Sequence, residues 1–159
     1  MRIYVLRHGE AARSVATEEQ ALTARGRQQV ASVGKLLQEL PLPQAIVHSP
    51  KLRARQTAAI VGEYLPGLPF QETAELVPES TPERVESVLH DLNLDCVLLV
   101  SHLPLVAELV AWLCNGTSGD YDLPGYPPAG LVALDAELPA RGCANQAFYA
   151  WPPLFEFRT

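Results

Sequence analysis

Two apolar runs that each end in a histidine constrain most strongly what this chain can fold into. The run Ile3–Leu6 leads directly into Arg7 and His8, and the run Cys96–Val100 is followed by a serine and then His102. Short runs of β-branched and other apolar residues predict buried strands. In an open α/β sheet, ligands bind at the carboxyl ends of the strands. We therefore expect one site, built from distant parts of the sequence, in which the two imidazoles meet.

Strand-like and helix-like segments alternate along the rest of the chain. Helical spacing of apolar residues and turn signals predict helices at 23–40, 49–64, 81–92 and 104–115. Further strands are predicted at 45–48, 130–135 and 146–151, and a weaker, edge-type strand plus loop at 70–77. This alternation predicts an α/β fold, a three-layer sandwich in which helices cover both faces of a mostly parallel sheet. No repeat, low-complexity tract or long linker divides the sequence, so we expect a single domain over residues 1–159.

The expected helix ends follow from local residue chemistry. Thr23 is placed to cap the first helix, and Ser49 to cap the second, with Pro50 at its first helical position. Gly116 is expected to close the fourth helix. Gly9 lets the backbone turn sharply or come close to a bound group after the first strand.

Composition and charge exclude several classes of protein. With 159 residues, 48% hydrophobic and 19% charged, the sequence is typical of a globular protein with a substantial core. Its formal net charge of −6 argues against general nucleic-acid binding, and no apolar run is long enough to cross a membrane. Basic residues are nevertheless concentrated near the start of the chain, where the first 55 residues include Arg7, Arg13, Arg25, Arg27, Lys51, Arg53 and Arg55. A local basic pocket in an acidic body suits a small anionic group.

The three cysteines indicate where the protein works. Cys96, Cys114 and Cys143 are odd in number and form no Cys-x-x-Cys pair, so neither a disulfide scaffold nor a zinc site is expected. The start of the chain lacks the pattern of a secretory signal. We therefore expect a cytoplasmic protein with no metal and no other cofactor.

Two arginines make the histidine pair more informative than either histidine alone. A lone histidine at a strand end is as often a capping or hydrogen-bonded residue as a functional one. For His48, at a strand end, and His90, late in an amphipathic helix, we favour a structural or surface role. Arg7 adjoins His8, however, and Arg53 lies in the first turns of the helix after Ser49. A guanidinium matches the oxygens of a phosphate with two parallel hydrogen bonds, and a helix start also favours anions.

Four sequence blocks in order resemble the histidine phosphatase superfamily, the phosphoglycerate mutase-like proteins. They are Arg7-His8-Gly9-Glu10, then Leu22-Thr23-x-x-Gly26 with a glutamine at Gln28 or Gln29, then Ser49-Pro50-x-Leu52-Arg53-Ala54-x-Gln56-Thr57, and finally Val100-Ser101-His102. The tripeptide alone is weak evidence, but the four blocks span about two thirds of the chain. The compact size and the residues after Ser101 are most similar to the SixA-type phosphohistidine phosphatases.

The resemblance implies a role for each matching residue. His8 matches the nucleophile that becomes a phosphohistidine, and Arg7, Arg53 and His102 match the rest of the catalytic, phosphate-binding pocket. Glu79 is the best positional match for a general acid.

The remaining positions of the resemblance stay open. Glu75 is a possible substitute for the general acid. Ser14 stands where many relatives carry an asparagine that touches phosphate, so that contact is in doubt. The role of the loop at 117–129 is open as well.

The physical requirements of phosphoryl transfer agree with these roles. The reaction needs in-line positioning and neutralisation of negative charge, which two guanidiniums and an imidazole supply without a metal. Nearby cations favour the neutral form of His8, which is the form that attacks. Between Glu79 and His102 one helix and one strand use up the chain, which leaves no room for a large lid insertion. The open site that follows suits a phosphorylated side chain on another protein.

Several readings of the site remain open from the sequence. The leading one is a phosphatase acting on protein phosphohistidine, with a histidine phosphotransfer or phosphocarrier domain as partner and the enzyme itself a monomer or weak oligomer. An alternative keeps the same chemistry on a small phosphomonoester. A phosphate-reading binding module without turnover is a third reading, and a two-histidine metal hydrolase is a distant fourth.

Overall fold

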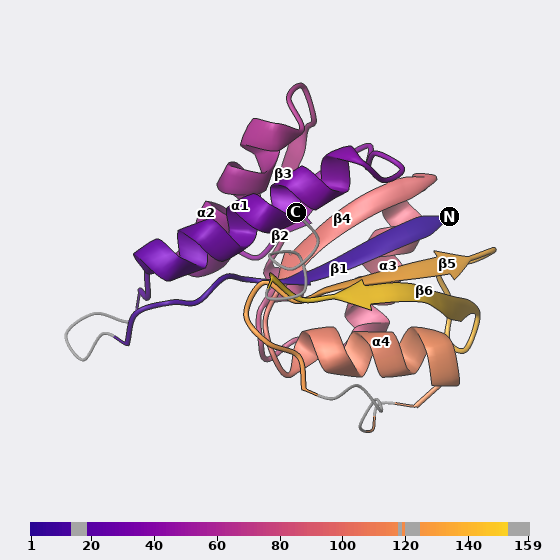
Figure 1. Cartoon of the computed structure of the whole chain (residues 1–159). Coiled ribbons are helices and arrows are strands. Elements are labelled where there is room, and N and C mark those ends of the chain that lie inside the picture. Colours follow the sequence, from indigo (N-terminus) through magenta and orange to yellow (C-terminus); the bar gives the residue numbers. More distant parts are fainter. Residues whose placement is uncertain (14–18, 118, 120–124, 153–159) are drawn as a thin grey trace.

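A six-stranded sheet runs through the middle of the molecule (Figure 1). The computed structural model describes residues 1–13, 19–117, 119 and 125–152. The strands are β1 (Arg2–Arg7), β2 (Ile46–His48), β3 (Phe70–Glu72), β4 (Cys96–Ser101), β5 (Leu131–Ala136) and β6 (Ala144–Ala150), in the order β3-β2-β4-β1-β5-β6. The strands β3, β2, β4 and β1 are parallel to one another. β5 pairs antiparallel with β1, and β6 pairs antiparallel with β5. The expected mostly parallel sheet is confirmed.

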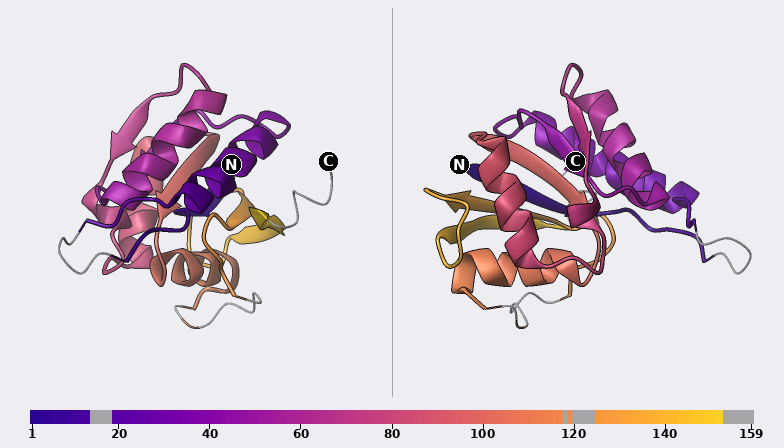
Figure 2. Two further views of the ribbon diagram at one scale, coloured as in Figure 1. Left: turned by 60° about the vertical axis from the view of Figure 1, so that its left-hand side comes forward. Right: turned by 180° about the vertical axis from the view of Figure 1, so that it is seen from behind.

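Helices cover both faces of this sheet, as Figures 1 and 2 show. The α-helices are α1 (Ala24–Gln38), α2 (Leu52–Tyr64), α3 (Pro82–Leu92) and α4 (Leu105–Asn115), and a short 3₁₀ helix, η1, spans Ala74–Leu76. α1 and α2 pack on one face, whereas α3 and α4 pack on the other. The predicted three-layer α/β sandwich is therefore confirmed.

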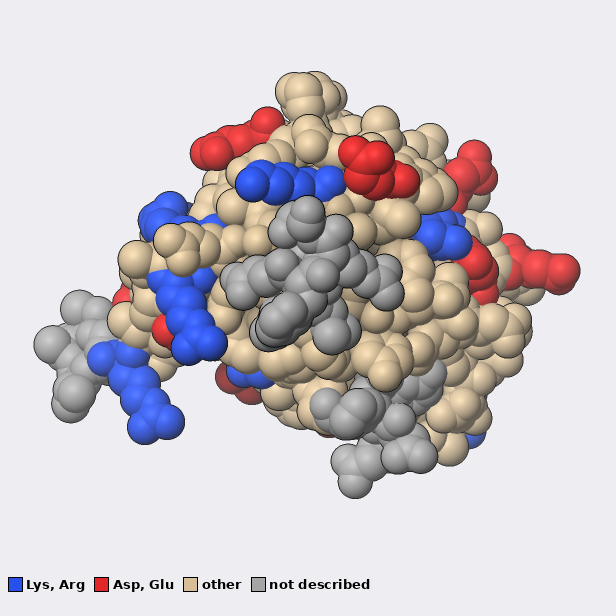
Figure 3. Space-filling view, viewed as in Figure 1, with Lys and Arg blue, Asp and Glu red and all other residues tan. Residues whose placement is uncertain are grey.

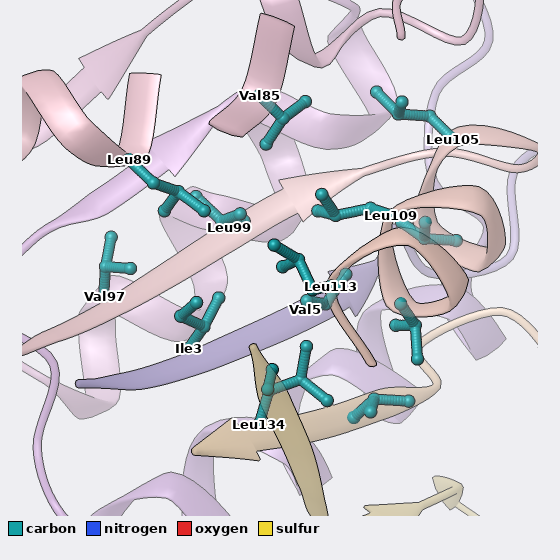
Figure 4. Close-up of a cluster of buried hydrophobic side chains, with 14 of the residues drawn as sticks. Ile3, Val5, Val85, Leu89, Val97, Leu99, Leu105, Leu109, Leu113 and Leu134 are labelled. Carbon is teal, nitrogen blue, oxygen red and sulfur yellow. The ribbon is translucent and has the colours of Figure 1, made fainter. Parts of the chain in front are cut away.

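The core consists of two apolar layers, one on each side of the sheet. Alternate residues of β1 point to opposite layers, as the period of a strand requires. Ile3 and Val5 pack with the apolar residues of α3 and α4 (Figure 4), whereas Tyr4 and Leu6 pack with those of α1 and α2. All four side chains are fully buried, which explains why this strand reads as one continuous apolar run.

The pairing of β1 with β4 sets the position of the histidines. The two strands are parallel neighbours, and their register puts Arg7 opposite Ser101. The backbone N–H of His8 donates to the carbonyl oxygen of Ser101 over 3.0 Å. His8 and His102 thus leave the sheet side by side at its carboxyl edge, as expected from the two apolar runs.

Two of the three expected helix ends are confirmed. The hydroxyl oxygen of Thr23 accepts a hydrogen bond from the backbone N–H of Gly26 over 2.9 Å, so Thr23 caps α1. Gly116 closes α4 with a φ of 73°, in the left-handed region that favours glycine.

The predicted start of α2 is wrong. Lys51 is its N-cap residue and makes no side-chain cap bond, and Ser49 and Pro50 precede the helix. The Ser49 hydroxyl lies 2.8 Å from Nε2 of His102 and therefore forms a hydrogen bond to a distant segment of the chain, not a cap on α2.

The segment from η1 to β4 is short. α3 is the one helix between them, and these residues hold no further element. The site at the carboxyl edge is therefore not covered by an insertion from this part of the chain, as predicted. Among the described residues, none of the helices combines the length and the apolar character that crossing a bilayer requires.

Candidate active site

Side chains from three elements meet where β1 and β4 end. The ring centroids of His8 and His102 lie 5.1 Å apart. Arg53, in the first turn of α2, places its Nε 3.3 Å from Nε2 of His8. The charge of Arg7 acts on both imidazoles, because it lowers the pKa of each. The structure therefore brings together the four residues that the sequence singled out.

Two hydrogen bonds determine which nitrogen of His8 carries the proton. Nδ1 lies 2.7 Å from the carbonyl oxygen of Gly9, which can only accept, so Nδ1 must be the donor. Nε2 accepts from the Nε–H of Arg53, which can only donate. The ring is thus held as the neutral tautomer with its lone pair on Nε2, the form in which an imidazole can act as a nucleophile.

Burial and nearby cations keep both imidazoles neutral. His8 is 8% exposed and His102 is 1% exposed. Desolvation is the largest cause that lowers the pKa of His8 from 6.5 to about 4; its hydrogen bond to Gly9 opposes this shift, and the charges of Arg53 and Arg7 add to it. Desolvation likewise lowers the pKa of His102 from 6.5 to about 3, and neighbouring basic groups lower it further.

The Arg7 guanidinium is held by a backbone carbonyl from the far end of the chain. Its Nη1 donates to the carbonyl oxygen of Tyr126 over 2.6 Å, and the Tyr126 hydroxyl donates to the carbonyl of Val5 over 2.7 Å. Tyr126 belongs to the described end of the loop at 117–129, whose role the sequence left open. Every residue has a backbone carbonyl, so residue type does not predict a contact of this kind, and sequence reasoning missed it.

The pocket contains buried polar atoms with no protein partner. Three such side-chain atoms occur in the described part of the chain, and two of them, Arg7 Nε and His102 Nδ1, belong to this site. An unpaired buried polar group costs free energy comparable to a lost hydrogen bond. Unpaired N–H groups beside positive charge are suited to binding an oxyanion.

Gly9 permits a close approach of two backbones. An added Cβ at Gly9 would lie 2.7 Å from the carbonyl oxygen of Gly26, and one at Gly26 would lie 2.1 Å from that of Glu10. The start of α1 therefore packs directly on the loop after β1. The sequence predicted a sharp turn at Gly9 or a close approach to a bound group, whereas the close approach that the structure shows is to α1.

The polar residues of the sequence blocks secure the backbone around His8. Gln29 Oε1 accepts from the N–H of Glu10 over 3.1 Å, so Gln29 and not the exposed Gln28 makes this contact. Thr57 Oγ1 accepts from the N–H of Gly9 over 3.1 Å. Gln56 Oε1 accepts from the N–H of Leu22 over 2.8 Å. These side chains support the loop, and the backbone groups that they bind could not be predicted from residue type.

The two candidate general acids, Glu79 and Glu75, interact with different arginines. The charge of Glu79 raises the pKa of Arg53, against the larger lowering by burial, so its carboxylate lies within electrostatic reach of the site. Glu75 pairs with Arg84 at 3.9 Å. Glu79 is exposed to solvent, as a group that exchanges protons with water must be. Ser14 lies outside the described residues.

The other two histidines lie outside this cluster. His48 is buried, and its Nδ1 bonds to the carbonyl oxygen of Ser49 over 2.9 Å. His90 is exposed on α3. Both positions suit the structural and surface roles that the sequence suggested.

Charge on the surface is unevenly distributed. In Figure 3 the basic side chains gather toward the left, around the start of α1, and most acidic ones lie toward the top and the right. The described residues contain no group of three His, Cys, Asp or Glu side chains arranged to hold a metal ion. Near the two imidazoles the positive charge comes from Arg53, Lys51 and Arg7, each of which lowers the pKa of His102.

Comparisons with known proteins point to one family. A family model described as the histidine phosphatase superfamily (branch 1) matches residues 3–79. Phosphohistidine phosphatase SixA of Escherichia coli (strain K12) is 38% identical over 155 residues, which are 91% of this chain and 91% of that protein.

Solved structures agree in fold. A protein histidine phosphatase SixA complexed with tungstate matches with a TM-score of 0.84 and 28% identity, over 97% of this chain and 99% of that one. A mycobacterial glucosyl-3-phosphoglycerate phosphatase in complex with VO3 matches with a TM-score of 0.74 over 92% of this chain and 97% of that one. Its 19% identity shows the shared fold alone.

Proposed function

We propose that this chain, which belongs to the histidine phosphatase superfamily, is a hydrolase that removes phosphate from phosphohistidine on other proteins. The 38% identical relative is named a phosphohistidine phosphatase, and the similarity extends over 91% of both chains. The observation that carries the proposal is the state of His8. Its unprotonated Nε2 lies against the Arg53 guanidinium in a buried cationic pocket.

In the first step, His8 takes the phosphoryl group. The lone pair of Nε2 forms a bond to phosphorus while the bond from phosphorus to the substrate nitrogen breaks. The electron pair leaves with the substrate nitrogen, which gains a proton. The hydrogen bond from Nδ1 to the Gly9 carbonyl, 2.7 Å long, stabilises the positive charge that the ring acquires.

In the second step, water restores the enzyme. A water oxygen forms a bond to phosphorus, the bond to Nε2 breaks, and the lone pair returns to His8 as inorganic phosphate leaves. The low pKa of His8, about 4, keeps Nε2 unprotonated at neutral pH, ready for another cycle.

The cationic side chains do the work of charge neutralisation. Arg7 and Arg53 both approach His8, and their guanidiniums are suited to the equatorial oxygens of the transferring group. His102 completes the pocket with the ring nitrogen that has no protein partner. Because the guanidiniums of Arg7 and Arg53 supply positive charge, the reaction is expected to proceed without a metal, and activity should be unchanged after treatment with a chelator.

Glu79 is proposed as the general acid. Its carboxylate acts on Arg53 electrostatically and is open to solvent, so that it can carry a proton to the departing nitrogen. Glu75, which pairs with Arg84 at 3.9 Å, is the weaker candidate.

The shape of the chain around the site supports a protein substrate. α3 is the one helix between η1 and β4, so that this segment supplies no cover over His8 and His102. A phosphohistidine on the surface of a phosphotransfer or phosphocarrier domain reaches such a site without unfolding. For the enzyme we propose a single domain, a monomer or weak oligomer, and a cytoplasmic location, which the odd number of cysteines and the lack of a Cys-x-x-Cys pair support.

The decisive experiment uses a phosphorylated histidine phosphocarrier protein as substrate. Incubation with the enzyme should release inorganic phosphate, and His8→Ala should abolish the release. His90→Ala, which removes an exposed histidine from α3, is the matched control and should retain full activity. Equal rates of phosphate loss with His8→Ala and with the unaltered protein would overturn the proposal.

Two further assays separate the alternatives. A panel of small phosphomonoesters should be hydrolysed with much lower kcat/KM than the phosphoprotein; a high value on one ester would assign the chain to small-molecule substrates. Rapid quenching with a reactive phosphate donor should leave acid-labile phosphate on His8. Binding without such labelling and without turnover would identify a phosphate-reading module.

A further inference from the structure

We infer that Ser49 is a positioning residue, whose hydroxyl donates to Nε2 of His102 and thereby holds that imidazole with its proton on Nδ1. The Nδ1–H is then the donor that His102 offers to a bound phosphoryl group. The inference rests on the proposed function of the site and adds a residue to it. Ser49 itself touches neither substrate nor reacting atoms.

The contact is short and sealed from solvent. Ser49 Oγ lies 2.8 Å from Nε2 of His102. Ser49 is 0% exposed, and His102 is 1% exposed. The backbone of Ser49 is fixed as well, since its N–H donates to the carbonyl of Val100 over 3.1 Å. The hydroxyl is thus presented to the ring from a rigid position at the end of β2.

Counting donors and acceptors gives the direction of the hydrogen bond. A serine hydroxyl has one proton to donate and two lone pairs. The N–H of Lys51, 3.3 Å away, uses one lone pair of Ser49 Oγ. If Nε2 of His102 also donated, the hydroxyl proton would have no acceptor among the described residues. With the hydroxyl donating to Nε2, the hydroxyl proton, the Lys51 N–H and the Nε2 lone pair all have partners, and only Nδ1 of the ring is left unpaired.

The electrostatics of the pocket make the choice of tautomer matter. Burial lowers the pKa of His102 to about 3, and His8, Arg53, Lys51 and Arg7 surround it with further basic groups; the carboxylate of Glu79 acts on Arg53. A neutral imidazole has one N–H. With the proton on Nε2, the lone pair of Nδ1 would be turned toward the oxygens of an anion and would repel them. Ser49 prevents this arrangement.

The other ring nitrogen is the one left for a ligand. His102 Nδ1 is buried and has no hydrogen-bond partner among the described residues. Arg7 Nε, a second donor of the same pocket, is also buried and has no hydrogen-bond partner among the described residues. A protonated Nδ1 therefore joins the guanidinium donors, and the pocket then presents only donors to an oxyanion apart from the attacking Nε2 of His8.

The direct test is the tautomer of His102 in the free protein. Nitrogen-15 spectra of the labelled protein near pH 7 should show the His102 proton on Nδ1, with His102→Asn identifying its signals among the four histidines. Ser49→Ala should shift His102 toward the Nε2–H form, and Ser49→Thr, which keeps a hydroxyl, should retain the Nδ1–H form. Added inorganic phosphate should perturb the Nδ1 signal.

The kinetic readout distinguishes positioning from mere support of the fold. Ser49→Ala should lower kcat on a phosphohistidine protein about tenfold with a smaller change in KM, and Ser49→Thr should restore most of it. The matched control is Ser101→Ala, which loses a buried hydrogen bond of the same kind, 2.7 Å to the carbonyl of Leu76. It should lower thermal stability and leave the His102 tautomer unchanged.

The outcomes separate the two proposals. A proton on Nε2 of His102 in the unaltered protein, or an unchanged tautomer in Ser49→Ala, would overturn the role of Ser49 even if the enzyme is active. The Nδ1–H tautomer in a protein that hydrolyses no phosphohistidine would overturn the proposed function and leave the role of Ser49 standing.

Discussion

The two edges of the sheet hold arginines in opposite electrostatic states. At the amino edge, Arg2 donates two hydrogen bonds to Asp135, 2.6 and 3.0 Å long, and this contact raises its pKa. At the carboxyl edge, burial lowers the pKa of Arg7 and of Arg53. Among the described residues, neither of these two forms an ion pair with a carboxylate. One edge neutralises its cation, and the other keeps its cations free for an anion.

The difference shows what marks the site in this fold. An open hollow of about 810 Å³ lies at the amino edge, lined by residues that include Met1, Arg2, Asp135 and Cys143. The imidazoles and the partly buried guanidiniums lie at the other edge. A carboxylate that is already bound to an arginine leaves that arginine little attraction for a further anion. Uncompensated positive charge, and not the size of a hollow, therefore identifies the site.

The largest effect should come from removing one of the free cations. Arg53→Ala should lower kcat/KM on a phosphohistidine protein roughly 10²–10³-fold, because it removes a preorganised donor to the transferring group. The free energy of unfolding should change by less than about 1 kcal/mol, because the relief of charge repulsion between Arg53 and Arg7 offsets the contacts that the variant loses. Steady-state kinetics and urea denaturation measure the two effects.

The matched control for this variant is on the same helix. Arg55→Ala removes an exposed arginine that pairs weakly with Glu19 at 4.0 Å. It should retain kcat/KM. Similar losses in the two variants would show that general positive charge, and not a specific donor, is what matters.

As the pH falls, the residues of the carboxyl edge should lose their contribution to the free energy of unfolding at a higher pH than those of the amino edge. The unfolded chain protonates His8 and His102 near their ordinary pKa of 6.5, whereas the folded chain does so near 4 and 3. The unfolded state therefore binds more protons as pH falls from 6.5 toward 4, and the free energy of unfolding should fall by a few kcal/mol. Urea midpoints at several pH values measure this slope.

The same titration compares the two edges within one experiment. The hydrogen bonds from Arg2 lower the pKa of Asp135 from 3.8, so its contribution is present above that value and is lost only at lower pH. His102→Gln should flatten the slope between pH 6.5 and 4. An unchanged slope in His102→Gln would contradict the low pKa of the buried ring.

A smaller effect is expected at the rim of the site. Glu79→Gln should lower kcat on a phosphohistidine protein on the order of tenfold, at the low end of general acid catalysis, because a ring nitrogen is a good leaving group. Glu75→Gln, which breaks only the ion pair with Arg84, should have no such effect. A larger loss with Glu75→Gln would exchange the roles of the two carboxylates.

The smallest effect should follow from breaking the pair at the amino edge. Arg2→Ala removes a partly exposed ion pair and should lower the free energy of unfolding by about 1 kcal/mol or less. Its kcat/KM should stay within twofold of the unaltered protein, which corresponds to a change of about 0.4 kcal/mol or less in the activation free energy. A marked loss of activity would show that the two edges are coupled.

Much of the fold and the site could be predicted from local patterns. Continuous apolar runs identified β1 and β4, and the turn residues Thr23 and Gly116 identified ends of α1 and α4. These predictions succeed because strand propensity, helix period and caps depend on neighbouring residues. The capping prediction for Ser49 failed because a distant group, the ring of His102, competes for the same hydroxyl.

The sequence by itself determined which residues bring charge and nucleophile to the carboxyl edge, since a parallel sheet places the ends of its strands together. Only the tertiary structure decided how they are held. The contacts of Arg7 with the Tyr126 carbonyl, of Gly9 with Gly26, and of Ser49 with His102 join segments that are far apart in the chain. Such contacts depend on packing geometry and on backbone atoms that every residue shares, so residue types alone do not reveal them.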